Sequence, residues 1–268
     1  MTKLSFCVNT FNEAAALQRL LLSSLPAAAI IREWVVLDHR SSDNTQAVLD
    51  SLEPALASAG VPLVRVTEPR DLSAEFTFAD LRNRTLDAAK GPLVMMLDAD
   101  FVLGHAFLPY ASEAVVALSK RGSEYHAATF PVPVVWDEIA TDEAGRITRH
   151  GRVWWHPRAA RILRWPSVRY YQDGKWEHVR NTDKRRAKRY SLRNDGDFVV
   201  SVNVKPSERL ALRRTMTMFM EDATSGRVAG GWLEAYEGGS LREMPEYEFD
   251  ASADLRGARL HAQNLRLP

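Results

Sequence analysis

The feature that most constrains the fold is an apolar run that ends in two acids, at residues 93–101. It follows Gly91-Pro92 and reads Leu-Val-Met-Met-Leu-Asp-Ala-Asp-Phe. Five consecutive apolar residues predict a strand that is buried on both faces, as in parallel sheets covered by helices. The strand ends at Asp98 and Asp100, and such a carboxylate pair suits a hard divalent cation such as Mg2+ or Mn2+. For this motif alone, two solvated acids at a strand end are the alternative.

The segments around this run predict strands that alternate with helices. The predicted strands are 4–8, 34–37 and 61–66, and the predicted helices are 14–25, 46–59 and 77–89. This alternation indicates an α/β fold with a mostly parallel central sheet flanked by helices. Ligands of such sheets bind at the carboxyl ends of the strands. Three polar clusters fall there, at residues 10–13, 38–45 and 98–100.

The second half of the chain is less regular. The pattern predicts a helix at 106–120, a strand at 127–136, an exposed turn or hairpin at 137–151 and a helix at 206–224. No internal repeat or low-complexity linker is present. At 268 residues, the chain suits one large domain or one domain with an appendage.

The apolar runs, the N-terminal sequence and the cysteine content indicate the cellular compartment in which the protein is expected. No apolar run approaches the roughly 20 residues that span a bilayer, so no transmembrane segment is expected. The N-terminus carries no secretory pattern, and the single cysteine, Cys7, cannot form an internal disulfide. These observations favour a reducing, cytoplasmic location.

The net charge of +1 conceals a strong segregation of charge. Residues 146–214 hold 19 Lys and Arg against 6 Asp and Glu, whereas the remainder of the chain is acidic. This balance favours an anionic partner such as a pyrophosphate, a nucleic acid or a lipid headgroup, with a solvated basic face as the alternative. The basic run 184–189 is predicted to be a mobile loop. It could clamp a diphosphate, bind an acidic acceptor or simply be solvated.

Taken together, the motifs resemble those of the family 2 glycosyltransferases. The family's opening segment is matched by Asn9-Thr10-Phe11-Asn12-Glu13, with asparagine in place of the usual proline. Its second block, Asp-Asp-Gly-Ser-x-Asp-x-Thr, is matched by Asp38-His39-Arg40-Ser41-Ser42-Asp43-Asn44-Thr45. An Arg-Asn pair, Arg82-Asn83, and Asp98-Ala99-Asp100 complete the pattern over residues 4–101. The resemblance implies a nucleotide-sugar-binding A-type fold, which is Rossmann-like, with a smaller C-terminal acceptor-side region.

The resemblance also implies roles for the matching residues. Asp38 would accept hydrogen bonds from a uracil-type base or its ribose, Asp43 would support that wall, and Arg82 would contact the nucleotide or its phosphates. Asp98 and Asp100 would hold the ribose and the metal diphosphate. The nucleotide-binding candidates are Thr10, Asn12, Glu13, Asp38, Arg40, Asp43, Arg82 and Asp98. Helix capping by Asp43 and a surface ion pair of Arg82 are the plainer alternatives.

A metal ligand and a catalytic base are expected further along the chain. Residues 158–178 resemble a subgroup pattern with a His-Glu pair, which here reads Glu177-His178. His178 would complete the metal shell of Asp98 and Asp100, because a neutral imidazole suits a third ligand beside carboxylates. Inverting members need a carboxylate to take the acceptor's proton, and Glu177 and Asp137 are the candidates.

The leading hypothesis is an inverting, metal-dependent glycosyltransferase. It would use a nucleoside-diphosphate sugar, most simply UDP-linked, with Mn2+ or Mg2+. The acceptor would offer a hydroxyl or another nucleophile and could be anionic: a nucleic acid, a lipid headgroup or a glycan. We expect a nucleotide-sugar-binding half at 1–104, an acceptor-side half of the same catalytic domain at 105–205 and a helical extension at 206–268.

Two other classes compete with this hypothesis. A non-catalytic module on the same fold could bind nucleotides, or nucleic acid through its basic segment. The pair of Asp98 and Asp100 argues against it, because a binding module has no need to hold a metal diphosphate. A nucleotidyltransferase usually carries a glycine-rich loop after its first strand, and residues 9–16 contain no glycine.

Overall fold

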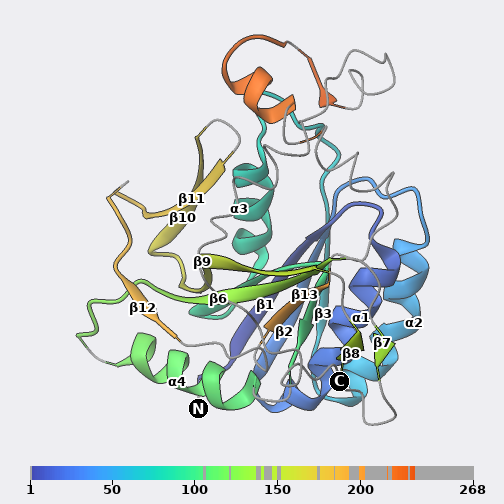
Figure 1. Ribbon diagram of the computed structural model, residues 1–268, viewed down its shortest axis with the longest axis vertical. Helices are drawn as coiled ribbons and strands as arrows, with labels where there is room; N and C mark the ends of the chain where they lie inside the picture. The colour runs from blue at the N-terminus through green and yellow to red at the C-terminus, as the bar shows by residue number, and fades with distance from the viewer. Residues whose placement is uncertain are drawn as a thin grey trace.

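The structure is a computed structural model, viewed as a ribbon in Figure 1. It describes residues 2–104, 107–120, 122–136, 140–141, 147–149, 152–173, 176–183, 185–192, 199–202, 216, 219–228 and 230–232. The predictions for Asp137 and for most of 206–268 therefore lie outside the described residues, as does the Glu177 side chain. The division into regions at 104 and 205 stays a prediction.

Four parallel strands form the centre of the molecule. They lie in the order β3 (Leu63–Thr67), β2 (Ile31–Asp38), β1 (Leu4–Thr10), β4 (Leu93–Asp98). Beyond β4 the sheet continues with β9 (Arg152–Arg164), β6 (Ala127–Trp136), β13 (Val199–Val202) and β5 (Phe101–Leu103). With β12 (Arg189–Ser191) paired to β6, the described part of the chain contributes nine strands to this sheet.

Helices cover both faces of the sheet. The helices are α1 (Ala14–Ser24), η1 (Leu25–Ile30), α2 (Thr45–Ser58), α3 (Phe78–Ala88) and α4 (Phe107–Ser119). One face carries α1, α2 and α4, and the other carries α3 with the hairpin of β10 (Val168–Asp173) and β11 (Trp176–Asn181) (Figure 1). A separate small hairpin joins β7 (Ala140–Thr141) to β8 (Ile147–Arg149). The predicted α/β fold with a mostly parallel sheet flanked by helices is confirmed.

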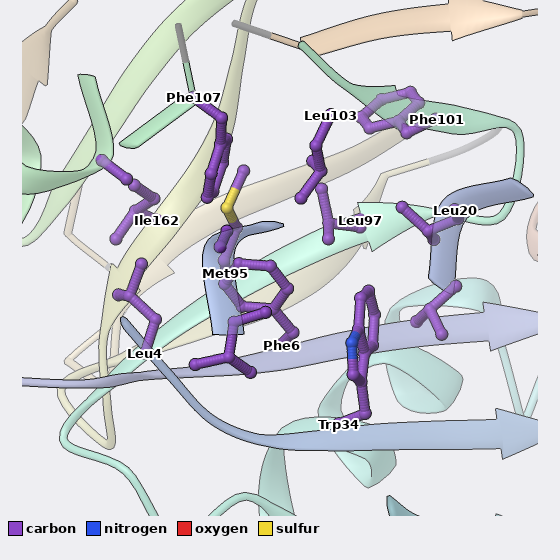
Figure 2. Packing of buried hydrophobic residues seen from close by; sticks show 14 of the residues in the cluster. Leu4, Phe6, Leu20, Trp34, Met95, Leu97, Phe101, Leu103, Phe107 and Ile162 are labelled. Atoms are coloured by element: carbon purple, nitrogen blue, oxygen red, sulfur yellow. The ribbon is translucent and has the colours of Figure 1, made fainter. Parts of the chain in front are cut away.

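The larger core lies between the central strands and α1, α2 and α4. Phe6 on β1 is fully buried, with its ring edge-to-face against Trp34 at 5.1 Å and against Phe107 at 5.7 Å between ring centroids (Figure 2). Leu20 and Leu97 pack around the same rings (Figure 2). Such aromatic pairs stabilise a core beyond the area that they bury.

The amino edge of the sheet contains a buried polar cluster. Glu33 on β2 accepts hydrogen bonds from the Ser5 hydroxyl and the Lys90 backbone N–H, both at 2.7 Å. Burial, with Glu33 adding to it, raises the pKa of the Cys7 thiol well above its usual range. A Cβ on Gly91 would lie 2.5 Å from the Ser5 hydroxyl, so glycine is required for this close approach. Cys7 is therefore a neutral core residue.

The carboxyl edge of the sheet is covered by a segment from late in the chain. Residues 219–224 are helical, and Phe219, Met220 and Trp232 pack with Leu37 and Leu72 into a third apolar cluster. In Figure 1 this segment is orange, above the sheet. The end of β2 is thus closed by residues remote from it in sequence.

Of the basic run 184–189, residues 185–188 form a connecting segment and Arg189 belongs to a strand, and the mobility of the segment stays a prediction. The run ends in β12, which pairs in parallel with β6 from Ala127 to Thr129. The Lys188 carbonyl accepts a hydrogen bond from the His126 N–H at 2.8 Å.

In the described part of the chain, no helix combines the length and the apolar character needed to cross a bilayer.

Candidate functional site

The ends of three neighbouring strands bring the polar clusters together. Thr10 is the register partner of Asp38, and Asn9 is the partner of Asp98. Neighbouring strands lie about 4.8 Å apart, so Thr10, Asp38 and Asp98 share one edge of the sheet. The sequence pattern predicted this juxtaposition, and the register of β1, β2 and β4 accounts for it.

The Thr10 hydroxyl is a buried polar group without a partner in the described structure. The residue is 3% exposed, and its Oγ1 makes no hydrogen bond. A buried hydroxyl that forms no hydrogen bond costs free energy, about 1–3 kcal/mol. A ligand atom at this edge would relieve that cost.

Asn12 joins the loop after β1 to the loop after β2. Its side-chain oxygen accepts hydrogen bonds from the backbone N–H groups of Ser42 at 2.6 Å and Asp43 at 3.2 Å. Its own N–H donates to the Ser41 hydroxyl at 2.8 Å. Asn12 has a φ of 51°, in the left-handed region, which asparagine tolerates better than most residues. The structure therefore uses this side chain to shape the loops.

Replacing Asn12 with alanine is expected to destabilise the protein by about 1–3 kcal/mol, because the two N–H groups lose their acceptor and alanine is strained at positive φ. Asn12→Gly removes the same hydrogen bonds but tolerates the backbone conformation. We expect glycine to cost less than alanine in urea unfolding. Equal stability of both variants and the wild type would contradict the role of this link.

Asp38 and Asp43 are both engaged by the loops around them. Asp38 accepts hydrogen bonds from the Ser41 N–H at 3.1 Å and from the Gln46 side chain at 2.6 Å. Asp43 accepts one from the N–H of Ala14, the first residue of α1, at 3.0 Å. Asp43 thus links the start of α1 to the β2 loop. Each Asp38 oxygen retains capacity to accept a further bond.

Arg82 on α3 pairs with Asp98. Its Nη2 lies 2.9 Å from Asp98 Oδ1, and both side chains are largely buried, at 19% and 27% exposed. The guanidinium carbon lies 5.4 Å from the centre of the Tyr170 ring on β10. Asp100 is 5% exposed. A cation and two carboxylates therefore occupy the end of β4, a composition that suits a diphosphate and a divalent ion.

Sequence reasoning missed a second ion pair at this edge. Glu68, 3% exposed, follows β3 and receives two hydrogen bonds from the Arg70 guanidinium, each 2.8 Å long. Hydrogen bonding from Arg70 lowers the pKa of Glu68, and the same bond raises the pKa of Arg70. The Arg70 carbonyl lies 2.8 Å from Nε2 of buried His39, which must carry the proton there. An acid directly after a predicted strand, as at Asp38 and Asp98, was the available signal.

Asn83 anchors the β10–β11 hairpin. Its side chain donates to the Tyr170 carbonyl and accepts from the Tyr170 N–H, both at 2.9 Å. These two hydrogen bonds satisfy the Tyr170 backbone in the way that a neighbouring strand of a sheet would. The resemblance drew attention to Arg82-Asn83 as a pair, and the structure gives the two residues different contacts.

The remaining candidates are spread over the site and beyond it. Glu13 precedes α1 and is half-buried, and Arg40 is exposed at a φ of 62°. His178 is exposed on β11, opposite Tyr171, and Glu177 lies opposite Gln172. Within the described residues, no three His, Cys, Asp or Glu side chains are gathered to hold a metal. The role of His178 beside Asp98 and Asp100 stays a prediction.

Residues 5–117, somewhat less than half of the chain, match Glycosyl transferase family 2. This part of the chain is similar to that family. The matched region comprises β1 to β4 and most of α4, and so includes every residue of the carboxyl edge described above except those on β10 and beyond. No curated protein matches the chain.

Solved structures of two proteins resemble this chain. Glucosyl-3-phosphoglycerate synthase from Mycobacterium tuberculosis is 20% identical, with a TM-score of 0.34, over 48% of this chain and 43% of the synthase. S. aureus TarS residues 1–349, in complex with UDP-GlcNAc, is 13% identical, with a TM-score of 0.47, over 76% of this chain and 60% of that one. The chain thus spans less than half of the synthase and under two thirds of the TarS fragment.

Proposed function

We propose that the protein transfers a sugar from a nucleoside-diphosphate sugar, most simply UDP-linked, to an acceptor nucleophile with inversion at the anomeric carbon. The observation that carries the proposal is the meeting of Thr10, Asp38 and the Arg82–Asp98 pair at one edge of the region that matches family 2. This edge offers acceptors to a base and ribose, and charge of both signs to a metal diphosphate.

The residues at the end of β4 fit a divalent cation that is bound jointly by protein carboxylates and by the phosphates of the sugar donor. Asp98 and Asp100 supply oxygen atoms, which Mg2+ and Mn2+ prefer. Mg2+ in particular is usually bound by one or two carboxylates together with substrate phosphates. The bound cation would neutralise charge that develops on the leaving diphosphate.

The protein side chains would bind the donor and take up the acceptor's proton. The acceptor oxygen forms a bond to the anomeric carbon while the bond from that carbon to the diphosphate oxygen breaks. Arg82, now paired with Asp98, is placed to shift toward the phosphates when they arrive. A carboxylate takes the acceptor's proton, and we retain Glu177 and Asp137 for this role. The Thr10 hydroxyl would donate to the nucleotide and so lose its unsatisfied state.

Titration of UDP into the protein by calorimetry, with and without Mn2+, tests the proposal. We expect binding that requires the metal and that weakens at least about tenfold in Asp100→Ala, because the variant lacks one oxygen ligand. UDP-glucose and UDP-GlcNAc, which are present in the similar structures, are the first sugar donors to compare. Failure of UDP and GDP to bind in either condition would overturn the proposal.

A further inference from the structure

Three arginines lie side by side on adjacent strands at the side of the molecule. Arg169 on β10 is the register partner of Arg180 on β11, and Arg180 is in turn paired with Arg186 through an isolated antiparallel bridge. Directly opposed residues in antiparallel pairs project to the same face, with Cβ atoms about 5 Å apart. We call Arg169, Arg180 and Arg186 the arginine row.

The arginine row faces away from the core. Val168 and Tyr170 on β10 and Val179 on β11 are buried with residues of α3. Side chains alternate along a strand, so Arg169 and Arg180 project to the opposite face. Ala187, next to Arg186, is also buried, which turns Arg186 outward. Arg180 and Arg186 are both exposed.

The positive charge of the row is only partly neutralised. Arg169 pairs with Asp87 at 2.6 Å, and its guanidinium lies 4.1 Å from the centre of the Trp165 ring. Arg180 and Arg186 form no ion pair in the described part of the chain. Like charges directly opposite each other on paired strands are destabilising. An anion between the two guanidinium groups would convert this repulsion into attraction.

Three carboxylates contact the segment from Arg185 to Tyr190, each through a residue other than Arg186. Asp183 lies 3.5 Å from the Arg185 side chain, and Glu124 pairs with Lys188. Glu113 accepts a hydrogen bond from the Tyr190 hydroxyl at 2.6 Å, which raises the pKa of Tyr190. These contacts leave the arginine row with more cations than anions.

A hollow of about 550 Å³ adjoins the row. Arg186, Lys188 and Arg189 contribute to its lining together with the hydroxyl-bearing Thr129 and Ser191. Pairing of β12 with β6 holds this lining in place. The hollow is a preformed concave surface with cationic and hydroxyl donors, which suits a phosphate better than a flat basic face does.

The hollow is separate from the candidate donor site. Leu163 on β9 pairs with both Val94 and Ala127, and Ala127 is the partner of Arg189. The β12 strand is therefore level with the start of β4, whereas Asp98 lies four residues further along, about 13 Å. In Figure 1, β12 lies beside α4, at the end of the sheet opposite to residues 219–224. This register excludes Arg189 from clamping a diphosphate at Asp98.

We propose that the arginine row and the adjoining hollow bind the phosphate group of a small phosphate ester, at a site distinct from the candidate donor site. Guanidinium groups recognise phosphate oxygens through paired N–H donors, and two arginines whose Cβ atoms lie about 5 Å apart can engage one phosphate from both sides. The shared chemistry is a phosphate monoester, either on a soluble molecule or on a lipid headgroup. This inference does not depend on the proposed glycosyl transfer.

Thermal unfolding with increasing inorganic phosphate at constant ionic strength tests the site. The wild type should gain stability in a saturable manner, and the double variant Arg180→Gln/Arg186→Gln should require at least about tenfold more phosphate for the same gain. Without phosphate, the double variant should be as stable as the wild type or more so, because the opposed charges are gone. A merely structural role for the arginines would lower stability in both conditions.

Arg65→Gln is the matched control. Arg65 is a partly exposed arginine paired with Asp50 and Glu53, and its loss changes the net charge in the same direction as each substitution in the row. We expect this variant to respond to phosphate as the wild type does. An equal response of the double variant, the control and the wild type would overturn the proposal. Asp98→Asn should retain the phosphate response, and its loss there would also overturn a separate site.

Vesicles with and without phosphatidic acid distinguish the two sources. Retention of the wild type on phosphatidic acid vesicles, lost in the double variant and displaced by free phosphate, would support a headgroup. Saturation by free phosphate without vesicle binding would support a soluble ester. Binding of a single-stranded oligonucleotide that free phosphate does not displace, with no saturable phosphate response, would overturn the small-ligand proposal.

Discussion

Replacing Asp100 with asparagine is expected to lower the rate of sugar transfer by about a thousandfold. Under the proposed function, a cation held by this carboxylate would stabilise the leaving diphosphate by several kcal/mol, and about 4 kcal/mol corresponds to a thousandfold in rate. Asn keeps the size of the side chain, and Asp100 lies in the turn after the buried strand β4 and is not a member of the apolar clusters. The rate is measured as UDP released from a UDP-sugar, with Mn2+ present.

Asp50→Asn is the control for this result. Asp50 is an exposed aspartate on α2 that pairs with Arg65, so the same chemical change is made far from the candidate site. We expect this variant to keep the wild-type rate, since exposed ion pairs contribute little. Asp98→Asn should also lose activity, because Arg82 loses its partner as well. Full activity in Asp100→Asn, with the melting temperature unchanged, would contradict a role at the diphosphate.

Replacing Phe6 with alanine is expected to reduce the free energy of unfolding by about 3–5 kcal/mol. Phe6 is fully buried on the central strand β1 and contacts the rings of Trp34 and Phe107 (Figure 2). Its removal leaves a cavity between two layers of secondary structure that cannot close without moving strands. Urea unfolding followed by circular dichroism measures the loss.

Val116→Ala provides the comparison for the core. Val116 is an apolar residue of α4 that is 67% exposed, and alanine is the better helix former. We expect its stability to lie within about 0.5 kcal/mol of the wild type. A Phe6→Ala cost below about 1 kcal/mol would mean that the described core packing does not carry the stability of the sheet.

Local patterns were enough to predict the central strands and the helices between them. Apolar runs such as 93–97 and helically spaced leucines such as Leu17, Leu20 and Leu21 are buried as expected. The structure moves the boundaries by a few residues: β2 begins at Ile31, before the predicted start at residue 34. Boundaries depend on pairing with neighbouring strands, which the sequence of one strand does not reveal.

Long-range contacts were beyond such patterns. The Asn12 side chain accepts a hydrogen bond from the loop after β2, and the Asn83 side chain donates one to a hairpin more than 80 residues away. His178 lies on β11 opposite Tyr171 and is exposed, a position that only the pairing of β10 with β11 determines. The arginine row arises from cross-strand register, although the basic run containing Arg186 was evident in the sequence.

By itself, the sequence determined that a parallel sheet would form and that acids would stand at the ends of its strands. Hydrophobic periodicity and turn residues act over a few positions, so they can be read locally. Only the tertiary structure decided which of these side chains meet: Arg82 with Asp98, Arg70 with Glu68, and Arg180 with Arg186. Strand register and helix packing set those meetings, because a shift of one residue turns every side chain of a strand to the other face.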